Sequence, residues 1–233
     1  MIAIRDLRKE YGRVVAVDSV SFSVEPGELV ALIGHNGAGK STTIKVLTGQ
    51  LRPTSGAVSV AGIDVVANPS AAREKLGYVP EEPALYDYLT CREFLELVVE
   101  LRGGGDLDEA LAMTGLGADA DRLIREYSQG MRRKTALAAA VVSKPPVLVL
   151  DEALNGLDPP SSARVKATLR QLCLQGATVL LSTHVLETVE RLADRVVMLA
   201  HGRVVADERV ADIGEEGLER LFLERIGQSL DGR

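Results

Sequence analysis

The stretch Gly34-His35-Asn36-Gly37-Ala38-Gly39-Lys40-Ser41-Thr42 has the pattern G-x-x-x-x-G-K-S-T. An unbroken apolar run at residues 29–33 precedes it and suits a buried strand, while residues 43–47 suit a helix. The glycines allow the loop to turn its backbone N–H groups toward an anion, and the positive end of the helix favours the same ligand. Lys40 is expected to reach the β- and γ-phosphates of a nucleotide, and the Ser41 hydroxyl to bind Mg²⁺.

Composition and charge limit the classes of protein to which the chain can belong. The 233 residues, 46% of them hydrophobic, suffice for one large domain or two small ones. The formal charge of −6 predicts no general attraction to nucleic acid or to an anionic bilayer. No apolar run approaches the ~20 residues of a membrane span, and the N-terminus does not resemble a signal peptide. Cys91 and Cys173 stand far apart without neighbouring histidines, which favours a cytosolic chain without disulfides or zinc.

The sequence predicts strands both before and after a long helical region. Residues 1–33 alternate between apolar and polar, which is typical of an antiparallel sheet with one solvated face. Residues 84–143 have helical spacing and include a capping box at Thr90–Glu93. Buried strands are expected again at 147–150 and 177–181, and the helical stretch between them predicts a parallel sheet with βαβ crossovers.

Three polar residues follow the predicted core strands. Asp151 and Glu152 come directly after residues 147–150, and His184 closes the next strand. In open α/β sheets, ligands bind at this carboxyl edge. Asp151 is expected to hold Mg²⁺ beside Ser41, and Glu152 to direct an attacking water as a general base. Taken alone, this carboxylate pair could equally be an exposed helix start. The position of His184 favours a role near the γ-phosphate.

Together these residues resemble the ATP-binding subunit of an ATP-binding cassette (ABC) transporter, over residues 2–226. The motifs that carry the resemblance stand in the family's order: Tyr11 with Ala16-Val17-Asp18, the loop at 34–42, Gly77-Tyr78-Val79-Pro80-Glu81, Tyr127-Ser128-Gln129-Gly130-Met131, Asp151-Glu152 with Asn155-Gly156-Leu157-Asp158, and Ser182-Thr183-His184.

The resemblance implies a fold and a domain division. The expected fold is α/β, with a phosphate-loop (RecA-like) core and a mainly parallel sheet, an N-terminal antiparallel β-subdomain and an inserted helical subdomain. A single ATPase domain would span residues 1–226. Its expected parts are residues 1–83 and 144–210 for the core with the β-subdomain, 84–143 for the helical subdomain, and 211–233 for a C-terminal helix and tail.

The resemblance also implies that ATP and Mg²⁺ are the cofactors and that each motif has a role. The Tyr11 ring would stack on adenine with Val17 nearby, and residues 34–42 would hold the phosphates. Ser41, Glu81 and Asp151 would arrange Mg²⁺ and its waters. Glu152 would activate water, with His184 and Glu81 also counted as catalytic.

A second anion site is implied at the segment that begins with Ser128. Its hydroxyl could simply cap a helix, and the residues alone favour that interpretation. The resemblance implies instead that Ser128, Gln129 and Gly130 of one subunit close the ATP site of another. Asp158, in the loop after Glu152, is also expected at the nucleotide.

The chain departs from the family pattern at several positions. Glu81 replaces the usual Gln and adds a negative charge near Mg²⁺ and phosphate. Gln129 and Met131 replace the first Gly and the final Gln of the family signature, and Ala153-Leu154 replaces a common Pro-Thr pair. Glu81 and the Tyr-Ser-Gln-Gly-Met segment resemble the exporter (ABC-2) branch, in which the permease is a separate subunit.

The implied function is ATP hydrolysis that powers transport, in the export direction, through a separate transmembrane permease. ATP would join two subunits head to tail, either two copies of this chain or this chain and a paired ABC subunit. The chain would be cytoplasmic and lie on the inner face of the cell membrane through its permease. Two alternatives are a soluble ABC ATPase acting in translation or DNA repair, which the acidic charge disfavours, and a non-hydrolysing nucleotide sensor, which Glu152 and His184 disfavour.

Overall fold

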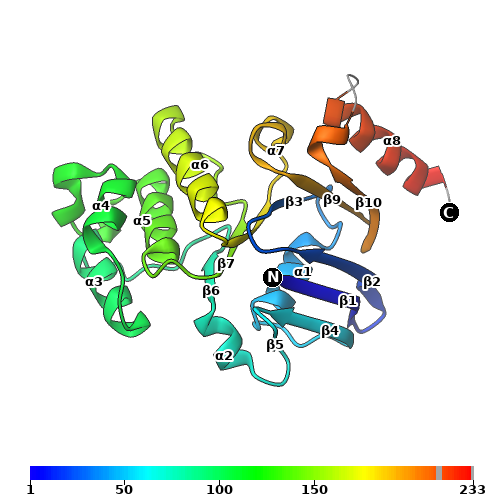
Figure 1. Cartoon of the computed structure of the whole chain (residues 1–233), viewed down its shortest axis with the longest axis horizontal. Helices are drawn as coiled ribbons and strands as arrows, with labels where there is room; N and C mark the ends of the chain where they lie inside the picture. The colour runs from blue at the N-terminus through cyan, green and yellow to red at the C-terminus, as the bar shows by residue number, and fades with distance from the viewer. Residues whose placement is uncertain (214–216, 232–233) are drawn as a thin grey trace.

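The computed structural model describes residues 1–213 and 217–231, which form two β-sheets and a group of helices (Figure 1). The larger sheet has six strands in the order β10-β9-β3-β8-β7-β6, and all neighbours are parallel except β10 and β9. Its strands are β3 (Leu29–Ile33), β6 (Leu76–Val79), β7 (Val147–Asp151), β8 (Thr178–Ser182), β9 (Arg195–Ala200) and β10 (Arg203–Arg209). This arrangement confirms the mainly parallel core sheet.

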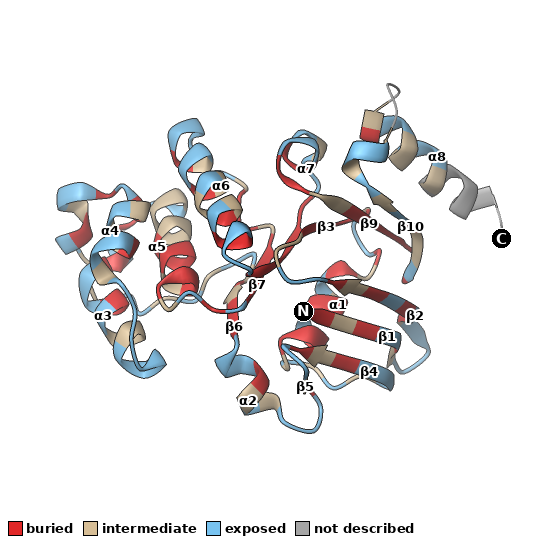
Figure 2. Cartoon of the chain, in the orientation of Figure 1, coloured by how far each residue is buried: buried red, intermediate tan, exposed pale blue. Residues whose placement is uncertain are grey.

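The N-terminal sheet is antiparallel throughout, in the order β2-β1-β4-β5. It comprises β1 (Ile2–Tyr11), β2 (Val14–Val24), β4 (Ser55–Val60) and β5 (Ile63–Asp64). Along β2, Val20, Phe22 and Val24 are buried while the serines between them are not, as the alternating sequence predicts. In Figure 2 the strands of this sheet alternate between buried and more exposed residues, whereas β3 and β7 of the core sheet are buried along their length.

The core sheet is covered on both faces because its strands send alternate side chains into two different hydrophobic clusters. In β3, Leu29, Ala31 and Ile33 belong to one cluster, and Val30 and Leu32 to the other. The first cluster includes side chains of α6 (Pro159–Leu174) and α7 (Leu186–Leu192). The second includes side chains of α1 (Lys40–Leu47) and of the N-terminal sheet. This burial explains why the core strands are unbroken apolar runs.

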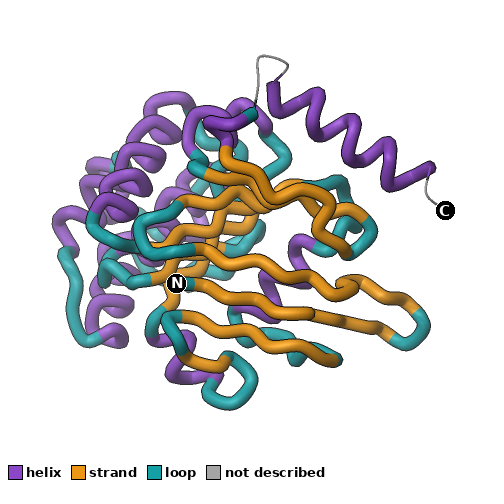
Figure 3. Tube along the Cα trace, turned by 45° about the vertical axis from the view of Figure 1, so that its right-hand side comes forward, coloured by secondary structure: helices purple, strands orange, loops and turns teal. Residues whose placement is uncertain are grey.

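The helical lobe is formed by α3 (Cys91–Arg102), α4 (Leu107–Thr114) and α5 (Gln129–Val141), with short 3₁₀ turns at Gly117–Asp121 and Ile124–Glu126. It lies at one side of the molecule, away from the N-terminal sheet (Figure 3). The predicted capping box is present at the start of α3: Glu93 N donates to Thr90 Oγ1 at 3.1 Å, and Thr90 N donates to Glu93 Oε2 at 2.8 Å. The domain limits at 83/84 and 143/144 stay predictions.

Helix α5 contributes to two hydrophobic clusters at once. Leu137 and Val141 belong to the cluster of the core sheet, whereas Ala138 belongs to the cluster of the lobe and Ala139 packs against it. The helix begins at Gln129 because Ser128 caps it. Thus α5 joins the lobe to the core through its own side chains.

The remaining helices are α2 (Pro69–Glu74), the 3₁₀ turn Val210–Asp212 and α8 (Gly217–Asp231). The C-terminal helix expected within residues 211–233 corresponds to α8, and residues 214–216 and 232–233 of that range lie outside the described residues. Leu218 is buried, and Leu221 and Phe222 pack against the core cluster. Within residues 1–213 and 217–231, no helix has the length and apolar character needed to cross a membrane.

Candidate nucleotide-binding site

The loop between β3 and α1 is built so that only glycine fits at two of its positions. A Cβ atom at Gly34 would lie 2.4 Å from Leu199 O, and one at Gly39 would lie 2.7 Å from Ala16 O. Gly39 has a left-handed φ of 105° and occupies the N-cap of α1. Because glycine has no side chain to cap the helix, the first N–H groups of α1 remain available to an anion.

Lys40 is held inside this loop. Its Nζ atom donates to Gly34 O at 2.6 Å and lies 3.3 Å from His35 O, and the residue is only 8% exposed. The ammonium group therefore sits on the loop that is expected to surround the phosphates. Its attachment to backbone carbonyls pre-organises the positive charge.

A cavity of about 400 Å³ opens over the loop and collects several predicted site residues. Its size is within the usual range for small-molecule sites. Glu81, Glu152 and His184 line it together with Ala16 and the loop, although they come from separate parts of the chain. The lining residues of the loop are His35, Asn36, Gly37, Ala38, Gly39, Lys40, Ser41 and Thr42. The structure thus brings the predicted phosphate loop and the three ionisable residues to one place.

Asp151 lies at the end of β7 and is 4% exposed. Burial raises the pKa of its carboxyl group, and the nearby charges of Glu152 and Glu81 raise it further. Its Oδ1 atom is buried and has no hydrogen-bond partner among the described residues. A buried carboxylate oxygen that lacks a partner fits a divalent cation, which would supply the missing positive charge.

Glu152 is oriented by three neighbours. Its backbone N–H donates to Ser182 O at 3.0 Å, Asn155 Nδ2 donates to its Oε2 at 2.8 Å, and His184 Nδ1 lies 3.1 Å from the same oxygen. The residue has a left-handed φ of 50°, which is unusual for a glutamate and recurs at functional sites. Glu152 is therefore a well-positioned carboxylate at the edge of the cavity.

The residues of the predicted second anion site lie outside this cavity. Ser128 is exposed at the start of α5, where its Oγ accepts from Met131 N at 3.3 Å, and Gln129 and Gly130 follow it. Asp158 caps α6 and lies 2.8 Å from Lys134 Nζ. Hydrogen bonding to Lys134 and Ser161 lowers the pKa of Asp158. The chain on its own does not bring these groups to the phosphate loop.

The two residues predicted to lie near adenine, Tyr11 and Val17, differ in their exposure. Tyr11 is 49% exposed near the β1–β2 turn, and Lys9 Nζ lies 5.2 Å from its ring centroid. Val17 is fully buried in the cluster below the loop and is absent from the cavity lining, so its side chain does not face the cavity. Ala16 lines the cavity instead. Strand alternation explains the difference between Ala16 and Val17, because neighbouring residues point to opposite faces. A role of Val17 at the nucleotide stays a prediction.

Arg133 is a residue near the site that the sequence did not single out. Its Nη1 atom donates to Asn155 O, and its Nη2 atom lies 3.3 Å from Glu81 O. An arginine near a helix start usually indicates a solvated face, so no local signal identifies these contacts.

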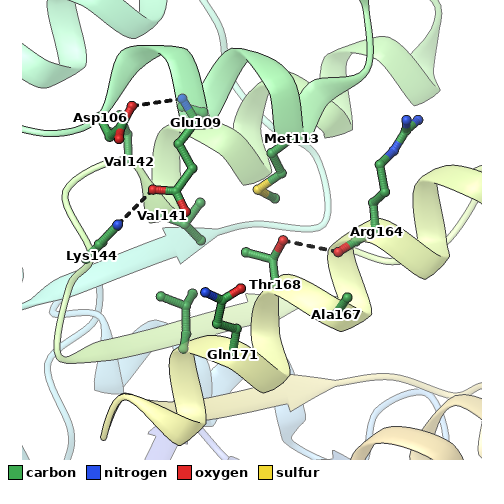
Figure 4. A pocket seen from close by; sticks show the side chains of 12 residues that line it. Asp106, Glu109, Met113, Val141, Val142, Lys144, Arg164, Ala167, Thr168 and Gln171 are labelled. Atoms are coloured by element: carbon green, nitrogen blue, oxygen red, sulfur yellow. Dashed lines mark hydrogen bonds and ion pairs between the residues drawn. The ribbon is translucent and has the colours of Figure 1, made fainter.

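A second cavity, of about 310 Å³, separates α4 and the end of α5 from α6 (Figure 4). Its rim carries the ion pair of Lys144 Nζ with Glu109 Oε2 at 2.7 Å, while Met113 points into it. None of the predicted site residues lines it. At this end the lobe and the core are therefore incompletely packed against each other.

The fold and the first cavity define a phosphate-loop nucleotide-binding domain. Residues 17–155 match the family model described as ABC transporter. The chain belongs to the ABC transporter family and is an ATP-binding and ATP-hydrolysing subunit. The family, the fold class and the ATPase activity expected from the sequence are thereby confirmed.

Two curated relatives are similar over nearly the whole chain. An uncharacterized ABC transporter ATP-binding protein of Bacillus subtilis is 36% identical over 238 residues, covering 100% of this chain and 79% of the relative. A lantibiotic transport ATP-binding protein of Streptococcus pyogenes is 32% identical over 228 residues, covering 97% of each chain.

Two solved structures have the same fold. The ATP-binding subunit of an ABC transporter has a TM-score of 0.90 and 34% identity, with 97% of this chain and 99% of that chain covered. A dimeric ATP-binding cassette in a post-hydrolysis state, bound to ADP and Pi, has a TM-score of 0.82 and 25% identity, with 90% and 99% covered.

Proposed function

We propose that this ATPase powers export through a separate transmembrane permease, from the inner face of the cell membrane. The observation that carries the ATP-driven pairing of subunits in this proposal is the division of the site: the phosphate loop, Glu152 and His184 share one cavity, whereas Ser128 lies outside it. A site divided in this way is completed by a second subunit. The similarity to a lantibiotic transport protein supports transport as the outcome of ATP hydrolysis.

Within one subunit, Lys40 and the loop N–H groups bind the β- and γ-phosphates, and the exposed ring of Tyr11 stacks on adenine. Ser41 and Asp151 would hold Mg²⁺, and Glu81 lines the same cavity as Ser41. When bound, Mg²⁺ neutralises charge on the phosphate oxygens. The unpartnered Oδ1 of Asp151 supports this assignment.

Glu152 accepts a proton from the water that attacks the γ-phosphorus. Asn155 and His184 hold the carboxylate at hydrogen-bond distance, so that its orientation is set before the nucleotide binds. His184 is 67% exposed on its side chain and therefore can also contact the γ-phosphate.

A second copy of the chain, or a paired ABC subunit, closes the site with the Ser128–Gly130 segment at the start of its α5. This helix end presents backbone N–H groups and a hydroxyl to an anion. The dimeric cassette among the similar structures supports the arrangement. ATP then joins the subunits, and its hydrolysis releases them.

The permease docks on an exposed aromatic groove of about 280 Å³ at the edge of the lobe. Tyr86 is 62% and Tyr88 is 78% exposed, and Leu89 and Leu97 complete the apolar surface. Aromatic side chains of this kind often dominate protein interfaces. The groove begins five residues after Glu81 in sequence, so the chain that forms it continues directly from a segment that lines the nucleotide cavity.

The proposal is tested by pull-down of the tagged chain from detergent-solubilised membranes of its source, with ATP turnover measured on the eluate. A polytopic membrane protein that co-elutes with the wild type, and with Leu101→Ala outside the groove, should be lost with Tyr88→Ala. Ribosomes or nucleic acid in the eluate, without a membrane protein, would instead assign the chain to the soluble ABC ATPases.

A further inference from the structure

The guanidinium group of Arg133 joins two segments that approach the nucleotide cavity. Its Nη1 atom donates to the carbonyl oxygen of Asn155, in the loop after Glu152, and its Nη2 atom lies 3.3 Å from the carbonyl oxygen of Glu81. Arg133 belongs to α5, five residues after Ser128 in sequence. One side chain therefore connects α5, here called the signature helix because it begins with the Ser128–Gly130 segment, to the Glu81 segment and to the loop after Glu152.

Asn155 links Arg133 to the carboxylate of Glu152 through hydrogen bonds. The backbone of Asn155 accepts from Arg133, and its side chain donates to Glu152 Oε2 at 2.8 Å. Gly156, with a left-handed φ of 70°, allows this approach, because a Cβ atom there would lie 3.2 Å from Arg133 Nη1. Displacement of Arg133 would therefore move the group that orients Glu152.

The neighbours of Arg133 on α5 do not bridge the Glu81 segment and the loop after Glu152 in their described contacts. Arg132 Nη1 pairs with Asp87 at 2.7 Å and lies 3.3 Å from the carbonyl oxygen of Ile124, which belongs to the lobe. Lys134 pairs with Asp158, which ends the loop after Glu152, and its described contacts include none with the Glu81 segment. A planar guanidinium can donate to two carbonyls at once, whereas a lysine ammonium lacks this fork. At the other end of α5, the cavity in Figure 4 separates the lobe from α6.

We propose that Arg133 is a positioning residue that couples the signature helix of a subunit to the orientation of Glu152 in the same subunit. The inference rests on the proposed role of Glu152. In the proposed dimer, Ser128 contacts the ATP of the other subunit, while Glu152 acts on the ATP of its own. Through Arg133, contact of Ser128 with the ATP of the other subunit would affect the orientation of Glu152, and so the hydrolysis of the subunit's own ATP.

The test compares Arg133→Gln with Arg132→Gln, a matched change of one neighbouring arginine. ATP turnover by the full chain, affinity for a fluorescent ATP analogue and Tm are measured for both. Arg133→Gln is expected to lower kcat roughly 10- to 100-fold, because the carboxylate loses its alignment, with nucleotide affinity within about twofold of wild type. Arg132→Gln should leave kcat within about twofold. Arg133→Lys should restore part of the activity.

Double substitution separates coupling from simple structural damage. Asn155→Ala should lower kcat in the same way, and adding Arg133→Gln to it should lower kcat little further. Equal kcat for Arg133→Gln and wild type, or fully multiplicative effects, would overturn the inference. If Arg133→Gln does not fold, Arg133→Lys decides, since loss of one hydrogen bond predicts a fall of roughly threefold and no fall contradicts it.

The proposed role of Glu152 is tested separately, by the turnover of Glu152→Gln. Full turnover by Glu152→Gln would remove the proposed role of Glu152. An inactive Glu152→Gln beside a fully active Arg133→Gln would refute only the role of Arg133.

Discussion

The Nδ1 atom of His184 lies 3.1 Å from Oε2 of Glu152, although the two residues are 32 positions apart in the chain. The side chain of His184 is 67% exposed and that of Glu152 only 12%. The imidazole ring therefore covers an otherwise buried carboxylate at the edge of the nucleotide cavity. This arrangement gives Glu152 a fixed orientation and leaves the ring accessible to a ligand.

Glu152→Gln should abolish most ATP turnover while preserving nucleotide binding. Glutamine keeps the shape of the side chain but cannot accept the proton of the attacking water, so kcat should fall roughly 10²- to 10⁴-fold. The variant should also accumulate as an ATP-bound dimer on gel filtration. Glu82→Gln, an exposed neighbour of the Glu81 segment, is the control with normal turnover. Rapid hydrolysis without a dimer would show that Glu152 is not the base.

Lys40→Ala should weaken ATP binding. The ammonium group lies within the phosphate loop, where charge-assisted hydrogen bonds contribute about 1.5–3 kcal/mol each, so affinity should fall by roughly one to two orders of magnitude. Isothermal titration calorimetry with ATP measures the change. Lys45→Ala, at an exposed position of the same helix, should leave affinity within about twofold. Comparable losses for both variants would contradict a specific role of Lys40.

Asp151→Asn should raise the stability of the nucleotide-free and metal-free protein at neutral pH. Burial, with the charges of Glu152 and Glu81, raises the pKa of Asp151 above its ordinary 3.8, so the native state holds this proton more tightly than the unfolded state. The protonated carboxyl group of Asp151 therefore contributes its full stabilisation below pH 3.8, and this contribution is lost as the pH rises through the raised pKa. Asparagine at this position has no carboxylate charge to bury.

The Tm of Asp151→Asn should therefore exceed that of wild type at pH 7, and the difference should shrink as the pH falls toward 4. Thermal unfolding between pH 5 and pH 8, without Mg²⁺ and ATP, measures it. Glu82→Gln serves as the exposed control. If the wild type has the higher Tm at pH 7, a partner of Asp151 must offset the cost of burying its charge.

Thr90→Ala should lower stability by about 1 kcal/mol, because both hydrogen bonds of the capping box at α3 depend on the Thr90–Glu93 pair. Urea unfolding gives the free energy of unfolding. Thr90→Ser keeps the hydroxyl and should retain most of the stability. Equal midpoints for the alanine and serine variants would mean that the cap does not contribute in the folded chain.

The phosphate loop and the strands were predictable because their signals are local. A glycine pattern between an apolar strand and a helix specifies the loop, and strand alternation specifies the N-terminal sheet. The meeting of Glu152 and His184 also follows from the sequence, since the ends of parallel strands lie at one edge.

Other parts of the site depend on tertiary packing and had no local signal. The two carbonyl partners of Arg133 lie 22 and 52 residues away, so its contacts arise only when α5 packs on the core. Val17 was expected near adenine; its side chain is buried in the core, whereas the half-buried Ala16 lines the cavity, so the role of Val17 stays a prediction. The roles of Tyr11, Ser128, Gln129, Gly130 and Asp158 at the nucleotide stay predictions.

Helix α5 places Leu137 and Val141 in the core cluster, and Ala138 in the cluster of the lobe with Ala139 packed against it. Loss of this helix would expose apolar surface in both parts simultaneously. The lobe is therefore not an independent cooperative unit, and denaturant should unfold lobe and core in a single transition with coincident probes. The same continuity means that the lobe can rotate as a rigid body only by repacking, or by carrying, the side chains that α5 shares with the core sheet.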